Sequence, residues 1–207
     1  GGGRVICGED QRTLLCDSHK KALPELEPKS CDGVEDCDKC DGVDDDCDGV
    51  LGNTCVGDFV VDATDTANDW AAVQYCKTIS GYLEIYDADT DVDLSNLSFL
   101  ESVGGYLYIT SNDSLTSLSG LNMLTSVGGS LSIHNNNGLT NLTGLDNLSS
   151  VGGYLFIASN HTLSSVAALG SLSSVGDYVW IYENIELVSL AGLEGLTSLP
   201  SYLYIYN

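Results

Sequence analysis

The sequence predicts an all-β fold: a right-handed parallel β-solenoid with 24-residue coils, preceded by a small, disulfide-rich, irregular N-terminal region. Three observations predict it. In one segment of each repeat, aliphatic residues alternate with aromatic or polar ones, and through the rest of the repeat an apolar residue, usually leucine, occupies every third position. All eight cysteines precede residue 77. Self-similarity at a fixed period of this length is typical of a solenoid. Without insertion or deletion, the repeats open every 24 residues at Ile79, Val103, Val127, Val151, Val175 and Leu199.

Each repeat contains one predicted strand, as in VGGYLYITSN (103–112). The fourth and sixth positions after the opening residue, Leu107 and Ile109 in this repeat, are aliphatic in every repeat. Alternation with period two is typical of a half-buried strand, so these positions are predicted to point inward. Coils stacked at about 4.8 Å would place six such strands side by side in one parallel sheet.

The other sides of each coil are predicted from leucines at every third position, as between 115 and 124, which enter the core in turn. Glycine pairs such as Gly104 and Gly105 are expected to permit a tight corner before the strand. An asparagine at the ninth position is expected to bond backbone groups at a bend and to stack with its equivalents, and we assign it no ligand. These asparagines are Asn112, Asn136, Asn160 and Asn184.

Aromatic residues dominate the outward positions of the predicted strands. Ten of the eleven tyrosines, with Phe156 and Trp180, lie at the third, fifth and seventh positions of a repeat. A monomer rarely exposes so large an apolar patch without a use, and rings with polar tips suit interfaces and sugar rings. Alternatively, aromatic residues simply favour strands and stack there, or the N-terminal segment folds over this face. The predicted binding face comprises Tyr106, Tyr108, Tyr154, Phe156, Tyr178, Trp180, Tyr182, Tyr202, Tyr204 and Tyr206.

The third repeat interrupts this aromatic stripe. Its outward positions are Ser130, Ser132 and His134, which are smaller or more polar than their equivalents. The sequence therefore predicts a shallow notch between two aromatic walls.

Three regions divide the chain: a Cys/Asp-rich region (1–57), a linker and N-terminal cap (58–78), and the solenoid (79–207). An apolar content of 43% is enough for a core. No stretch resembles a transmembrane segment, the chain starts without Met, and its clustered cysteines favour disulfides in an oxidising compartment. A secreted protein is therefore expected, although eight cysteines allow 105 pairings.

The net charge of −23 limits the classes of partner. Lys77 is the only Lys or Arg after residue 60. Nucleic acids and anionic lipids both require cationic side chains, so neither is predicted as a partner. Such a chain is instead expected to attract cations.

The densest chemical motif is the duplicated acidic unit CDGVEDCDKCDGVDDDCDG (31–49). Its second copy reads D-x-D-x-D-G, in which alternate carboxylates can converge on one hard cation and Gly49 allows a sharp turn. Cys55 stands where an EF-hand would need a bidentate Glu, so no EF-hand is predicted. An acidic loop without metal and a cysteine-bound zinc are the alternatives, but crowded carboxylates repel and favour calcium. The predicted calcium ligands are Asp41, Asp44, Asp46 and Asp48.

The same stretch resembles a short Cys/Asp repeat, CDGxDxDCDG, of bacterial secreted proteins that is named for a copper-binding surface protein. The resemblance implies an extracellular, metal-associated module. Copper itself is disfavoured because soft and imidazole ligands are scarce, with only His19 nearby and Met123 far away in the sequence.

A broader resemblance begins at YCKTISGYLEIYD (75–87) and continues through the L-x-I-x-x-N repeats to residue 207. This part resembles receptor L domains, the leucine-rich modules of the insulin and epidermal growth factor receptors. The resemblance implies an extracellular binding or adhesive role, with the sheet face as the contact surface. It also implies that Cys76 caps the solenoid by pairing upstream, with Cys55 as the expected partner.

No enzyme is predicted. The three histidines stand alone, and no metalloprotease, nucleophile-elbow or phosphate-cradling motif occurs. Glu84 and Glu183 lie at the strand face but four coils apart, about 19 Å at the usual strand spacing, which is too far for glycoside hydrolysis.

The chain ends at Asn207, part-way through a coil. The sequence is then a fragment, or another segment covers the end, or the end docks on the next copy, which would build open filaments. The leading hypothesis is an extracellular structural or adhesive protein, a self-associating fibre or sheath subunit at the cell surface, stabilised by calcium and disulfides. The alternative is a glycan- or protein-binding module that uses the aromatic sheet face.

Overall fold

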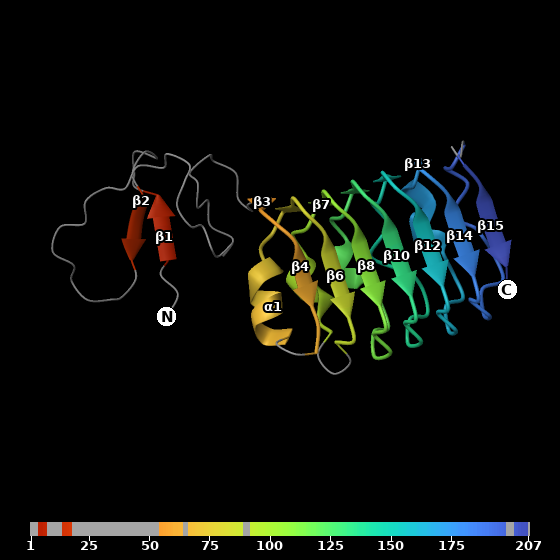
Figure 1. The fold of residues 1–207 in the computed structure, drawn as a ribbon, viewed down its shortest axis with the longest axis horizontal. Coiled ribbons are helices and arrows are strands. Elements are labelled where there is room, and N and C mark those ends of the chain that lie inside the picture. The colour runs from red at the N-terminus through yellow and green to blue at the C-terminus, as the bar shows by residue number, and fades with distance from the viewer. Residues whose placement is uncertain are drawn as a thin grey trace.

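A computed structural model describes residues 4–7, 14–17, 54–63, 66–88, 92–197 and 201–206. Two parallel sheets, of seven and six strands, form two sides of a solenoid, and the predicted all-β parallel solenoid is confirmed. Figure 1 shows the strands of the larger sheet side by side along the long axis of the molecule. An antiparallel pair near the N-terminus, β1 (Arg4–Cys7) with β2 (Leu14–Asp17), is separate from both sheets.

The strands of each sheet follow one another in chain order, one per coil. The larger sheet consists of β4 (Phe59–Val61), β6 (Leu83–Tyr86), β8 (Leu107–Thr110), β10 (Leu131–His134), β12 (Leu155–Ala158), β14 (Val179–Tyr182) and β15 (Leu203–Tyr206). The smaller sheet consists of β3 (Thr54–Cys55), β5 (Thr78–Ile79), β7 (Ser102–Val103), β9 (Ser126–Val127), β11 (Ser150–Val151) and β13 (Ser174–Val175). The described helices are α1 (Thr66–Val73) and three short 3₁₀ helices, η1 (Leu94–Leu97), η2 (Ser119–Leu121) and η3 (Ala167–Ser171).

The 24-residue register holds throughout the pairing. Leu131 pairs with Leu107 and Leu155, and the same offset joins every neighbouring pair of strands. Inward residues such as Leu107 and Ile109 are fully buried, as are the leucines that recur in threes on the other sides. The predicted inward residues are therefore buried in coils with strands β6 to β14, whereas in the last strand, β15, Leu203 and Ile205 are 49% and 42% exposed.

Buried asparagines form the predicted ladder at the bends that follow β8, β10, β12 and β14. The backbone N–H of Asn112 donates to Oδ1 of Asn136 (3.1 Å), while Nδ2 of Asn136 donates to the carbonyl oxygens of Ile109 (2.9 Å) and His134 (3.1 Å). The residue before each of these asparagines has a left-handed φ of 52–57°. This conformation turns the chain out of the strand, and the asparagine then satisfies the backbone groups that the turn would leave unpaired.

The solenoid begins one coil earlier than its predicted first residue. Cys55 pairs with Ile79 and Phe59 with Leu83, so the register of the repeats extends back through residues predicted as linker and cap. Helix α1 lies at the β4 end of the coils and buries Trp70 and Val73 against the core (Figure 1). We call this additional coil, residues 54–78, coil zero, and number the following coils one to six.

Cys55 and Cys76 form a disulfide with a Cα–Cα distance of 5.6 Å. This is the pair that the resemblance to receptor L domains implied. It joins the beginning and end of coil zero, and both cysteines are buried.

Candidate binding face

The outward side chains of the larger sheet stand in three rows because equivalent residues pair in register. We call the outward aromatic residues together the aromatic face. Row one is the residue before each strand, row two the second strand residue and row three the last. Row one runs Tyr82, Tyr106, Ser130, Tyr154, Tyr178, Tyr202; row two Glu84, Tyr108, Ser132, Phe156, Trp180, Tyr204; and row three Tyr86, Thr110, His134, Ala158, Tyr182, Tyr206.

Tyrosines of row one stack on one another along the solenoid axis. The ring centroids of Tyr154 and Tyr178 are 5.1 Å apart with planes within 6°, and those of Tyr178 and Tyr202 are 5.3 Å apart within 4°. Tyr82 and Tyr106 stack in the same way at 4.3 Å and 7°. Each ring therefore turns a face toward its neighbour in the row, which leaves ring edges and phenol groups at the outer surface.

Rings of row two meet edge to face instead. Phe156 and Trp180 lie 5.8 Å apart at 84°, and Trp180 and Tyr204 lie 5.5 Å apart at 79°. Both arrangements are favourable for aromatic pairs. The rings hold one another in fixed orientations, so the face is preorganised.

The expected notch at coil three is bridged in the structure. The hydroxyl of Tyr108 hydrogen bonds to that of Tyr154 across the intervening coil, and Tyr108 also stacks on Tyr106 with centroids 4.1 Å apart. Only 3% of Ser132 is exposed beneath this bridge. The two aromatic walls are thus joined into one continuous surface from Tyr82 to Tyr202.

His134 contributes a polar group beside the bridge. Its Nδ1 is 3.0 Å from Oγ of Ser132, and its ring meets Phe156 edge to face at 5.6 Å. Burial lowers the pKa of His134, because desolvation disfavours the charged imidazolium. The imidazole is therefore neutral at physiological pH.

Two of the three outward positions of coil zero, on either side of Val60, are acidic. Oδ1 of Asp58 accepts a hydrogen bond from the backbone N–H of Tyr82 (2.9 Å), and Oδ2 of Asp62 accepts one from the hydroxyl of Tyr86 (3.3 Å). With Glu84 of row two, we call these residues the acidic strip. Asp58 and Asp62 were not among the predicted site residues, although counting back 24 residues from Tyr82 and Tyr86 identifies both.

The hydroxyls of Tyr86, Tyr106 and Tyr154 are held in the neutral form. Burial, followed by the charges of nearby groups including Glu84, raises the pKa of Tyr106 to about 12. Burial and the hydrogen bond with Tyr108 raise the pKa of Tyr154 to about 12, and the Asp62 carboxylate raises the pKa of Tyr86. Neutral phenols can both donate and accept hydrogen bonds at physiological pH.

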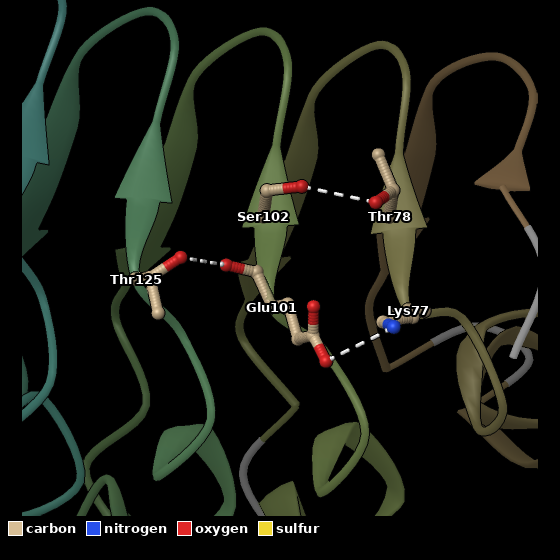
Figure 2. Close-up of polar contacts among 5 residues, drawn as sticks. All are labelled: Lys77, Thr78, Glu101, Ser102 and Thr125. Atoms are coloured by element: carbon tan, nitrogen blue, oxygen red, sulfur yellow. Dashed lines mark hydrogen bonds and ion pairs between the residues drawn. The ribbon is translucent and has the colours of Figure 1, made fainter.

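The smaller sheet presents a different surface. Hydroxyl groups predominate there, as Figure 2 shows. Oγ1 of Thr78 and Oγ of Ser102 are 3.0 Å apart, and the hydroxyl of Thr125 donates to the backbone carbonyl oxygen of Glu101. Nζ of Lys77 lies 3.3 Å from the Glu101 carboxylate at the start of this sheet. Lys77, which is the only Lys or Arg after residue 60, is thus ion-paired away from the aromatic face.

The predicted calcium ligands, Asp41, Asp44, Asp46 and Asp48, lie outside the described residues. Within the part that the structure describes, no group of three or more His, Cys, Asp or Glu side chains is arranged to hold a metal. Among the same residues, none of the helices is long and apolar enough to cross a membrane.

Residues 75–168 match the model of the Receptor L domain family. The match begins at Tyr75, beside the disulfide-bonded Cys76, and covers coils one to three and most of coil four. Receptor L domains are extracellular domains that bind ligands and are not enzymes. Comparison of the chain with curated proteins finds no significant match.

Proposed function

We propose that this protein is an extracellular recognition module whose contact surface is the aromatic face. The set of rings on coils one, two and four to six, joined over coil three by the hydrogen bond between Tyr108 and Tyr154, carries this proposal. The family match over 75–168 and the Cys55–Cys76 disulfide support it, because the first indicates ligand binding and the second an oxidising compartment.

The core does not require these aromatic residues. In coils one to five, Leu107, Ile109 and their equivalents fill the interior on the other side of the same strands. Tyrosines that remain partly exposed, such as Tyr86 at 38%, cost solubility and add nothing to the interior. Large, rigid rings with polar tips give contact area at low cost in side-chain entropy, as binding surfaces need.

The test compares binding of wild-type protein and a face variant, Tyr178→Ala with Trp180→Ala, to arrays of oligosaccharides and of extracellular protein domains. Both residues lie at the centre of the ring cluster, so their truncation should weaken binding about tenfold or more. The matched control is Phe99→Ala with Met123→Ala. These side chains are 55% and 48% exposed and lie outside both sheets.

Array ligands that bind the wild type and the control variant, but bind the face variant weakly or not at all, would support the proposal. If array ligands bound both variants as tightly as the wild type, the contact surface would lie elsewhere. Circular dichroism and thermal unfolding of both variants establish that each retains the solenoid.

Self-association through the same face is a second candidate, in which the protein is a subunit of a surface fibre or sheath. The observation that favours it is the repetition of identical tyrosines in row one, because a regular row of ring edges and phenol groups can pack against the same row of another copy. Sedimentation velocity across a range of concentrations, with and without calcium, tests it. A monomer that persists at the highest concentration would rule this candidate out.

A further inference from the structure

We infer that the ligand of the aromatic face is a basic protein segment, which places Arg and Lys side chains over the phenol groups and the acidic strip. This inference rests on the proposed function and adds the chemical class of the partner. It follows from the charge of the face, from the orientation of its rings and from the hydrogen-bonding capacity of its hydroxyls.

The charge of the face has one sign. In the described residues, the three rows and the outward positions of coil zero include three carboxylates, Asp58, Asp62 and Glu84, and no Lys or Arg. His134 is neutral, as argued above, and Lys77 is ion-paired with Glu101 on the smaller sheet. With a net charge of −23 on the whole chain, the surface attracts cations and repels anions.

The acidic strip is continuous with the aromatic rings. Glu84 pairs in the sheet with Val60 on one side and Tyr108 on the other, so its carboxylate lies between coil zero and the first stacked tyrosines. Asp177 and Glu183 stand at the two ends of the strand in coil five, immediately before and after its outward aromatic residues. Their carboxylates accept hydrogen bonds from Ser201 and Ser159 of the adjacent coils, so a bound cation would find carboxylates beside the rings of coil five as well as beside those of coil one.

In row one, the orientation of the rings favours a basic partner over a glycan. Sugar rings bind aromatic side chains through open ring faces, whereas in row one the faces of Tyr154, Tyr178 and Tyr202 are turned toward each other. What the row offers outward is a line of phenol groups. A phenol oxygen beside a carboxylate is a good acceptor for a guanidinium or ammonium group, which has donors and no acceptor.

Guanidinium groups fit this surface in a second way. The edge-to-face rings of row two, Phe156, Trp180 and Tyr204, alternate in orientation, so some ring surface remains for a planar cation to stack on. Arginine can thus stack and donate hydrogen bonds at the same time. A second copy of this chain, carrying the same large negative charge, is disfavoured by repulsion.

The experiment uses three probes with isothermal titration calorimetry at near-physiological ionic strength. They are a synthetic peptide of alternating Arg and Gly, the same peptide with citrulline in place of every Arg, and a neutral cello-oligosaccharide. Citrulline retains the planar group and removes the charge. We expect the Arg peptide to bind at least tenfold more tightly than the citrulline peptide, and its affinity to fall as salt is added.

Matched variants separate the face from general attraction to a polyanion. Glu84→Gln and Glu186→Gln remove the same charge, but Glu84 lies in row two, whereas Glu186 follows β14 in an exposed turn. We expect Glu84→Gln to lower the affinity for the Arg peptide about threefold or more. Glu186→Gln should leave that affinity within about twofold of the wild-type value. Trp180→Leu, which keeps an apolar side chain in place, should also lower the affinity for the Arg peptide.

Equal binding of the Arg and citrulline peptides, or equal effects of Glu84→Gln and Glu186→Gln, would overturn the inference. A different outcome is that the oligosaccharide binds the wild type, binds Trp180→Leu less tightly, and the Arg peptide does not bind. The face would then recognise glycans, so the proposed function would stand and this inference would fall. If array ligands bound both the face variant and the control variant unchanged, the proposed function would fail first.

Discussion

At the scale of single residues, buried asparagines fix the bends after four successive strands, β8, β10, β12 and β14. Asn112, Asn136, Asn160 and Asn184 are fully buried, and each accepts hydrogen bonds from the coil before it. A buried amide can remain in an apolar interior when its donors and acceptor are satisfied. The ladder thus has a structural role, and the aromatic residues on the other side of the strands remain available for binding.

The first prediction is that Asn136→Ala destabilises the protein by about 3 kcal/mol. Truncation removes the acceptor for the Asn112 backbone N–H and the donor to the Ile109 carbonyl, and both groups stay buried without partners. Urea unfolding followed by circular dichroism measures the change. Asn147→Ala is the control, since this exposed side chain makes one hydrogen bond, to Asn122 (2.7 Å), and its loss should cost less than about 1 kcal/mol. Equal losses in the two variants would contradict the role given to the ladder.

At the scale of elements, the corner between the two sheets depends on glycine for a steric reason. The corner glycines Gly104, Gly128 and Gly152 do not have a left-handed φ, so conformational freedom does not explain them. A Cβ on Gly128 would overlap the carbonyl oxygen of Gly104 in the coil before it. Adjacent coils therefore approach closely at this corner, backbone to backbone.

Gly128→Ala is accordingly expected to destabilise the solenoid by about 2–4 kcal/mol, because a rigid carbonyl must move to admit the methyl group. The control is Gly170→Ala in η3, where an added Cβ meets no atom within 4 Å. This second variant should leave the stability unchanged or raise it slightly, since alanine loses less backbone entropy than glycine. The midpoints of thermal unfolding of the two variants give the comparison, and similar midpoints would show that the corner is not tightly packed.

At the scale of the whole molecule, one structural unit is repeated, and the backbone of each coil pairs with the coils next to it. Helix α1 and the Cys55–Cys76 disulfide close coil zero at one end of the core, and the in-register sheets carry equivalent outward side chains along the axis. Because the unit repeats, equivalent outward positions of successive coils form a row. The three rows together form a surface large enough for a macromolecular ligand.

Calcium removal tests the sequence motif at 31–49. If Asp41, Asp44, Asp46 and Asp48 bind calcium, a chelator should lower the thermal midpoint of that region by several degrees, and excess calcium should restore it. The replacement of Asp44 and Asp46 by Asn is the matched variant, because it removes the charges and retains the side-chain size. A midpoint that does not respond to chelator in the wild type would refute a stabilising calcium ion.

The sequence by itself determined the register, and with it most of the fold and of the candidate face. A gapless 24-residue repeat fixes which residues are equivalent, and alternation along a strand fixes which of them point inward, so Leu107 could be assigned to the core and Tyr106 to the surface. The asparagine ladder follows for the same reason, because its members share one position in the repeat.

Only the tertiary structure decided what depends on contacts between non-equivalent positions. Tyr108 reaches Tyr154 across coil three, 46 residues away, and so joins two aromatic walls that the repeat alone would leave separate. The folding of residues 54–78 into another coil, closed by α1 and the disulfide, likewise depends on packing against coil one. Periodicity specifies where a side chain begins on the surface, whereas its final contacts depend on its length and on the space that its neighbours leave.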